Sequence, residues 1–127
     1  MPKKLQLIIS AVVVICVSFV YGFNPSKILP NVFGFEVESL ELKNIFRAIM
    51  GLYIFLGVFW LIGVWKEELW KSATLSNIVF MEGLAFGRSI SIVVDGVSVQ
   101  FLIATILEFL TMLWGIYNLK KYGNLNM

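Results

Sequence analysis

The segment FMEGLAFGRSISIVVDG, residues 80–96, is the critical segment for predicting the fold, because it permits two incompatible interpretations. As part of an apolar helix, it carries a glutamate and an arginine into a lipid environment. As a β-hairpin, it supplies the alternation from Ser89 to Val99 around an Asp95-Gly96 turn, which is typical of soluble proteins. A lone hairpin in a membrane would leave backbone hydrogen-bonding groups unpaired against lipid. The composition of the whole chain therefore decides between the two interpretations.

That composition is typical of a membrane protein. Of the 127 residues, 59% are hydrophobic and 14% are charged, whereas soluble domains have about 25% charged residues. The mean hydropathy is +0.88, and uncharged stretches approaching about 20 residues recur, which is the length that a helix needs to span a bilayer. We therefore prefer the helical interpretation of residues 80–96 and expect an all-α fold.

The apolar runs predict a single transmembrane domain over residues 1–127, an integral membrane four-helix bundle with up-down-up-down topology. The expected helices cover about residues 5–23, 44–65, 72–94 and 97–119, with an outer loop at about residues 24–43. A cleaved signal peptide is the alternative for the first run, but its length and its terminal aromatic residues favour a retained helix. Ser39 followed by Glu41 predicts that the second helix begins before it enters the membrane.

The positions of the lysines predict the orientation, because positive residues in short loops favour the cytoplasmic side. One side of the bundle carries the six residues Lys3, Lys4, Lys66, Lys71, Lys120 and Lys121. The other side carries Lys27 and Lys43 among the acidic residues Glu36, Glu38, Glu41 and Asp95. We therefore expect both termini in the cytoplasm and a multi-pass protein of the inner (cytoplasmic) membrane.

Several classes of function receive no support from the sequence. The chain has no histidine and one cysteine, Cys16, so the usual zinc, haem and Ser-His or Cys-His catalytic sets are incomplete. We expect no metal, no cofactor and no enzymatic activity. The lysines lie near the ends of apolar runs and form no basic stripe, so we expect contact with the lipid bilayer and none with nucleic acid.

Charged residues inside the spans are the best candidates for a site, because they are unfavourable in lipid and generally face the bundle interior. We expect Arg47, Arg88 and Glu108 to meet in the outer half of the bundle. Glu82 lies on a separate face of its helix and either joins them through its long side chain or serves another contact. The expected buried polar cluster and candidate ligand site comprises Asn44, Arg47, Glu82, Arg88, Ser91, Asp95 and Glu108.

The sequence leaves three functions open, and the second of them uses the lipid-facing surface instead of this cluster. Two neighbouring guanidinium groups suit an anionic lipid or a similar amphiphile, so binding of such a ligand is the leading hypothesis, while a purely structural ion-pair network is the simplest alternative. The second hypothesis is an accessory or scaffold subunit that joins a membrane-protein partner or a second copy. The third is a small proton-coupled transporter using Glu82 and Glu108, although no titratable residue obviously continues that relay toward the cytoplasm.

Glycines mark the expected helix contacts. Gly83 and Gly87 form a GxxxG match in the third span, and Gly51 lies in the second span. Small residues allow close approach of membrane helices. We assign this role to packing within the chain in preference to dimerisation.

The segments LKNIFRAIMGLY (residues 42–53) and MEGLAFGRSISIVVDG (residues 81–96), followed by Glu108, resemble a bacterial family of small four-span membrane proteins, domain of unknown function 4345. The resemblance covers nearly the whole chain, including YGFNP at residues 21–25. It implies that the family-type positions are Asn44, Arg47, Gly51, Gly87, Arg88, Asp95, Gly96 and Glu108. The family pattern often has proline soon after Asp-Gly, where this chain has Val97-Ser98. No activity comes with the resemblance.

Overall fold

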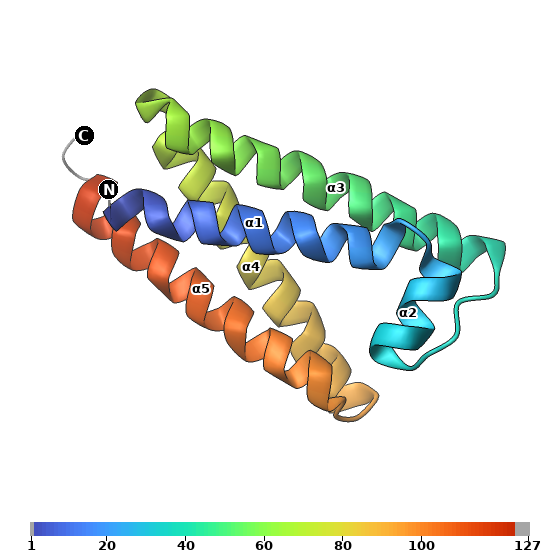
Figure 1. The fold of residues 1–127 in the computed structure, drawn as a ribbon. Coiled ribbons are helices and arrows are strands. Elements are labelled where there is room, and N and C mark those ends of the chain that lie inside the picture. The colour runs from blue at the N-terminus through green and yellow to red at the C-terminus, as the bar shows by residue number, and fades with distance from the viewer. Residues whose placement is uncertain (1, 124–127) are drawn as a thin grey trace.

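The computed structural model describes residues 2–123 as an all-α protein (Figure 1). Its helices are α1 (Pro2–Gly22), α2 (Pro25–Phe33), α3 (Leu40–Trp65), α4 (Glu67–Val94) and α5 (Val99–Gly123). By length and hydropathy, α1, α3, α4 and α5 are candidate membrane spans. These four helices alternate in direction along the bundle, which agrees with the predicted up-down-up-down order. The helical interpretation of residues 80–94 is confirmed, since no strand occurs anywhere in residues 2–123.

Local sequence signals fix the ends of the long helices. The Ser39 hydroxyl accepts a hydrogen bond from the backbone N–H of Leu42 at 3.1 Å, so it caps α3 as predicted. After α4, Asp95 remains helical and Gly96 takes a φ of 113°, a conformation that favours glycine. Asp95-Gly96 is therefore a turn between two helices. Lys66 alone separates α3 from α4.

The expected outer loop contains an additional helix, α2. Pro25 begins it, where a missing N–H does no harm, and Gly34 ends it with a φ of 80°. Its last residue, Phe33, accepts a hydrogen bond through its carbonyl oxygen from the Gln100 side chain at 3.2 Å. Because Gln100 lies at the start of α5, this contact joins α2 to the opposite side of the bundle.

The spans form two antiparallel pairs, α1 with α3 and α4 with α5 (Figure 1). The pairs lie close together where α1 begins and α5 ends, and they diverge toward α2 (Figure 1). We call these regions the terminal end and the α2 end of the bundle. The difference between them determines where a ligand finds room.

Close packing at the terminal end depends on glycines other than the three predicted packing positions. A Cβ at Gly63 would come within 2.4 Å of the Ala73 Cβ, and a Cβ at Gly115 within 2.8 Å of Ile78. By contrast, a Cβ at each of the predicted packing positions Gly51, Gly83 and Gly87 would meet no atom within 4 Å. The prediction that these three glycines pack helices within the chain is wrong. Glycine spacing identifies small residues, but it does not tell which of them face a neighbouring helix.

Uncharged polar residues also lie in the interior of this half. The Gln6 amide donates to the Asn77 side chain at 2.7 Å and to the Thr111 carbonyl at 3.3 Å, so it links α1 with α4 and α5. Both amide side chains are fully buried. These contacts give the bundle a specific interior arrangement, which apolar side chains in lipid do not enforce.

Candidate functional site

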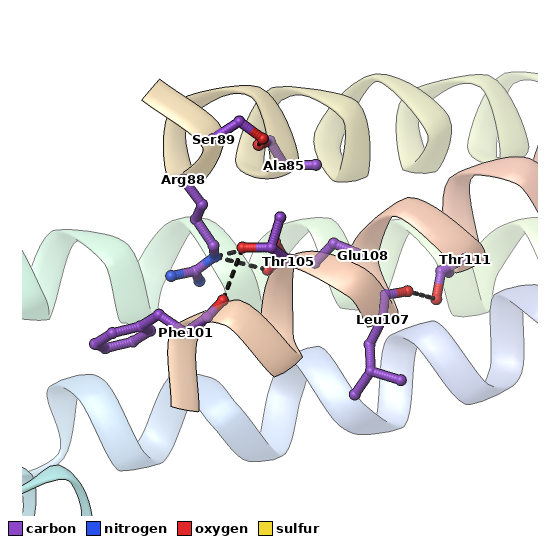
Figure 2. Close-up of polar contacts among 8 residues, drawn as sticks. All are labelled: Ala85, Arg88, Ser89, Phe101, Thr105, Leu107, Glu108 and Thr111. Atoms are coloured by element: carbon purple, nitrogen blue, oxygen red, sulfur yellow. Dashed lines mark hydrogen bonds and ion pairs between the residues drawn. The ribbon is translucent and has the colours of Figure 1, made fainter. Parts of the chain in front are cut away.

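The centre of the site is an ion pair between α4 and α5 near the α2 end (Figure 2). The Arg88 Nε donates to both carboxylate oxygens of Glu108, at 3.0 and 3.2 Å. The two side chains are only 21% and 13% exposed. Since a helix rises about 1.5 Å per residue, Arg88 lies about 9 Å from the end of α4 at Val94. The pair thus neutralises two charges inside the span.

Neighbouring hydroxyl groups do not participate in the ion pair. Ser89 and Thr105 donate to carbonyl oxygens on their own helices, those of Ala85 and Phe101, at 2.7 Å (Figure 2). Such bonds satisfy the hydroxyl groups locally. Instead, the Arg88 Cζ lies over the Phe101 ring, 5.2 Å from its centre, a favourable cation–π geometry. The Glu108 carboxylate and the Phe101 ring therefore both contribute to positioning the arginine.

Arg88 borders a cavity of about 480 Å³ between the two helix pairs. The cavity is lined by Tyr21, Phe35, Phe46, Ile49, Tyr53, Gly83, Leu84, Gly87, Arg88 and Phe101. Arg88 is the one charged side chain in this lining. A second cavity of about 220 Å³ lies on the side of α1 and α5 and includes Glu108 in its walls. The arginine thus stands between two largely apolar spaces.

Aromatic side chains pack together between α1, α2 and α3 at this level, and one of them reaches α5. Tyr21 is the centre of the group, with ring centroids 6.0 Å from Phe33, 5.8 Å from Phe46 and 6.1 Å from Tyr53. Phe33 in turn stacks on Phe101 at 5.3 Å, so α2 closes the space between α1 and α5. Large rigid rings do not fill all the volume between diverging helices, so a cavity remains beside Arg88.

The predicted meeting of Arg47 with Arg88 and Glu108 does not occur. The Arg47 guanidinium donates to the carbonyl oxygens of Gly22 and Phe23, at 2.9 and 3.1 Å, and its residue is exposed. The C-terminal end of α1 leaves these carbonyl groups without helical partners and has a partial negative charge, so it attracts the arginine. Within residues 2–123, the expected buried cluster of charged residues is thus reduced to one ion pair.

The other predicted members lie separately on the surface of the helices. Asn44 is exposed near the start of α3, and Glu82 is exposed on α4. Ser91 donates to the Asp95 carboxylate at 2.8 Å, and both residues are exposed at the end of α4. Their predicted place in one buried cluster is therefore wrong. Helical spacing correctly predicts which residues of one helix share a face, but it does not predict which neighbouring helix that face contacts.

The aromatic residues around Tyr21 and the buried amides Gln6 and Asn77 were not predicted as site or packing residues. Tyr21 and Tyr53 look like ordinary membrane aromatics in sequence, and no local signal separates them from those that face lipid. Gln6 did carry a signal, because it is the one amide side chain in the first apolar run. An uncharged polar residue inside a span seeks a partner for the same reason that a charge does.

Four apolar helices and an interhelical ion pair define the class: a multi-pass helical membrane protein. The chain belongs to the family described as Domain of unknown function (DUF4345), which it matches over residues 2–119. The match includes both Arg88 and Glu108, and it confirms the family resemblance found in the sequence. No curated protein and no solved structure matches the chain.

Proposed function

We propose that this protein binds an amphiphile with an acidic headgroup in the cavity beside Arg88, without catalysing a reaction on it. One observation carries the proposal: a 480 Å³ cavity has aromatic, aliphatic and glycine walls and a single charged lining residue, Arg88. Ligand pockets commonly have volumes of about 300–1,000 Å³ and combine apolar walls with a few polar groups. An amphiphile fits such a cavity, because it combines one polar group with an apolar body.

The geometry of Arg88 supports an acidic headgroup in particular. Glu108 is bonded to Nε, while the two Nη groups point away from Glu108 (Figure 2). A guanidinium group presents its N–H donors in a rigid fork, which suits the two oxygens of a carboxylate or a phosphate. The existing bond fixes the orientation of the fork before a ligand arrives, so less side-chain entropy is lost on binding.

The walls of the cavity support an apolar body for the ligand. Phe46, Ile49 and Tyr53 line it from α3, and Leu84 lines it from α4. A Cβ at Gly83 would meet no atom within 4 Å, so this glycine contributes open volume. A hydrocarbon chain would thus contact side chains on both helix pairs.

The test is native mass spectrometry of the protein reconstituted with phosphatidylglycerol and gently released. The double variant Arg88→Gln/Glu108→Gln removes both charges but keeps hydrogen-bonding side chains between α4 and α5, and Arg47→Gln is the matched control. We expect wild type and the control to retain phosphatidylglycerol, and the double variant to lose about tenfold in retention, since one charge-assisted contact contributes about 1.5–3 kcal/mol. Equal retention by a correctly folded double variant would contradict the proposal.

We also propose that both termini face the cytoplasm and that the membrane is the inner membrane. The support is the sequence: six lysines belong to the terminal end, and four acidic residues belong to the α2 end. A membrane-impermeant thiol reagent should therefore label a single cysteine at Ser26 in intact cells, in a Cys16→Ser background. It should leave a cysteine at Ser72 unlabelled, and the reverse pattern would exclude this orientation.

A further inference from the structure

Glu82 occupies an unusual position for a charged residue, the outward face of α4. Residues spaced by three or four positions along this helix form a stripe with exposed fractions between 48% and 85%: Leu75, Val79, Phe86, Ile90 and Val93. Glu82 is exposed in the middle of this stripe. By helical rise, it lies about 22 Å from the start of α4 and about 18 Å from its end, close to the middle of the span.

An ionised carboxylate in that position is stabilised by a cationic partner from outside the chain. A charged residue at the centre of a bilayer is unfavourable by about 2.5–3.5 kcal/mol on insertion scales. Within residues 2–123, Glu82 has no hydrogen bond and no ion pair. Arg88, the nearest charge on its helix, is paired with Glu108. Lipid headgroups lie about 15 Å from the bilayer centre, so their ammonium groups do not reach it.

We propose that Glu82 and its flanking stripe bind a transmembrane helix of another membrane protein that carries a lysine or an arginine at mid-depth. Charge complementarity identifies this partner, because a cation held at the same depth pairs with the carboxylate. Val79 and Phe86, one turn away on each side, are 60% and 67% exposed and supply the apolar contacts.

A second copy of the chain fits this surface poorly. A symmetric contact between two α4 helices would place two Glu82 carboxylates opposite each other, and like charges at close range repel in a low-dielectric medium. The Arg88 of such a copy is engaged by its own Glu108. The surface is also separate from the Arg88 cavity, so this inference does not depend on the proposed amphiphile.

The test uses two synthetic transmembrane peptides of leucine and alanine, one with a central lysine and a matched one with leucine at that position. Association with the labelled full chain is measured by fluorescence energy transfer in phosphatidylcholine vesicles at neutral pH. We expect the lysine peptide to bind wild type about tenfold better than the leucine peptide, since an interhelical polar contact contributes about 1–2 kcal/mol. Glu82→Gln should abolish this preference, whereas Glu68→Gln, a control at the exposed start of α4, should keep it.

A further variant, Glu82→Lys, should bind a peptide with a central glutamate in preference to the lysine peptide. The exposed position of Glu82 allows these variants to fold, and circular dichroism verifies their helix content. Equal binding of the lysine and leucine peptides to wild type, or a preference that survives Glu82→Gln, overturns the inference. Glu82-dependent association between two labelled copies of the chain, with no preference for the lysine peptide, overturns it in favour of a homo-oligomer.

Discussion

The two ends of the bundle are built from the same four spans and differ in how the helices meet. At the terminal end, the two pairs approach closely where Gly63 of α3 meets Ala73 of α4, and Trp60 and Trp70 are buried, whereas at the α2 end the close approach at Gly22 lies within one pair, against Met50 of α3. Near the α2 end, Tyr21 packs against rings of α2 and α3, and a cavity lies between the helix pairs beside the ion pair. The terminal end therefore contributes mainly to stability, whereas the α2 end has room for a ligand.

The largest expected effect comes from the glycines. Gly63→Leu should lower the free energy of unfolding by about 3 kcal/mol, because even a Cβ would come within 2.4 Å of Ala73. Gly83→Leu, the matched change in the wall of the Arg88 cavity, should lower it by less than about 1 kcal/mol, because its side chain enters open volume. Thermal unfolding in detergent, followed by circular dichroism, measures both. Equal losses would break the distinction between the two ends.

The ion pair should have an intermediate effect. Glu108→Ala should lower the free energy of unfolding by about 2 kcal/mol, because Arg88 would remain largely buried without its carboxylate. Arg88→Gln together with Glu108→Gln should lower it by only about 1 kcal/mol, because no unpaired charge remains. A double-mutant cycle over these two positions measures the coupling. Additive losses of stability would show that Arg88 and Glu108 are not energetically coupled.

The buried amides should have the smallest effect. Gln6→Met keeps the approximate volume but removes the bonds to Asn77 and the Thr111 carbonyl, and it should lower the free energy of unfolding by about 1 kcal/mol. The control Gln100→Met removes an exposed bond at the α2 end and should change stability by less than about 0.5 kcal/mol. Chemical denaturation of the three proteins sharpens the comparison, and a larger loss for Gln100→Met would reverse it.

Much of the fold follows from the sequence alone because its signals are local. Runs of apolar residues predict four spans, Ser39 predicts a cap, and Asp95-Gly96 predicts a turn between helices. The helix α2 was not predicted because Asn24-Pro25 and Pro30-Asn31 are typical of turns, whereas in the structure Pro30 lies inside the helix. Orientation in the membrane stays a prediction from the lysines.

The site was only partly predictable, because it depends on which helices become neighbours. Arg88 and Glu108 meet as expected, but α1 packs along α3 and offers Arg47 the carbonyl groups at its end. Helical periodicity resolves the faces of a single helix and gives no information on the choice of partner helix. The same limitation led to the wrong placement of Glu82 and to the wrong set of packing glycines.

The bonds of Gln6 also constrain the order in which the protein assembles. Ribosomes synthesise α1 first, yet its buried amide binds to Asn77 in α4 and to Thr111 in α5, the last span to emerge. Until then, the first span enters the bilayer with an unsatisfied polar group and so gains less from insertion. Completion of the bundle therefore waits until α5 has been synthesised, and chains truncated before α5 should remain substrates for membrane quality control.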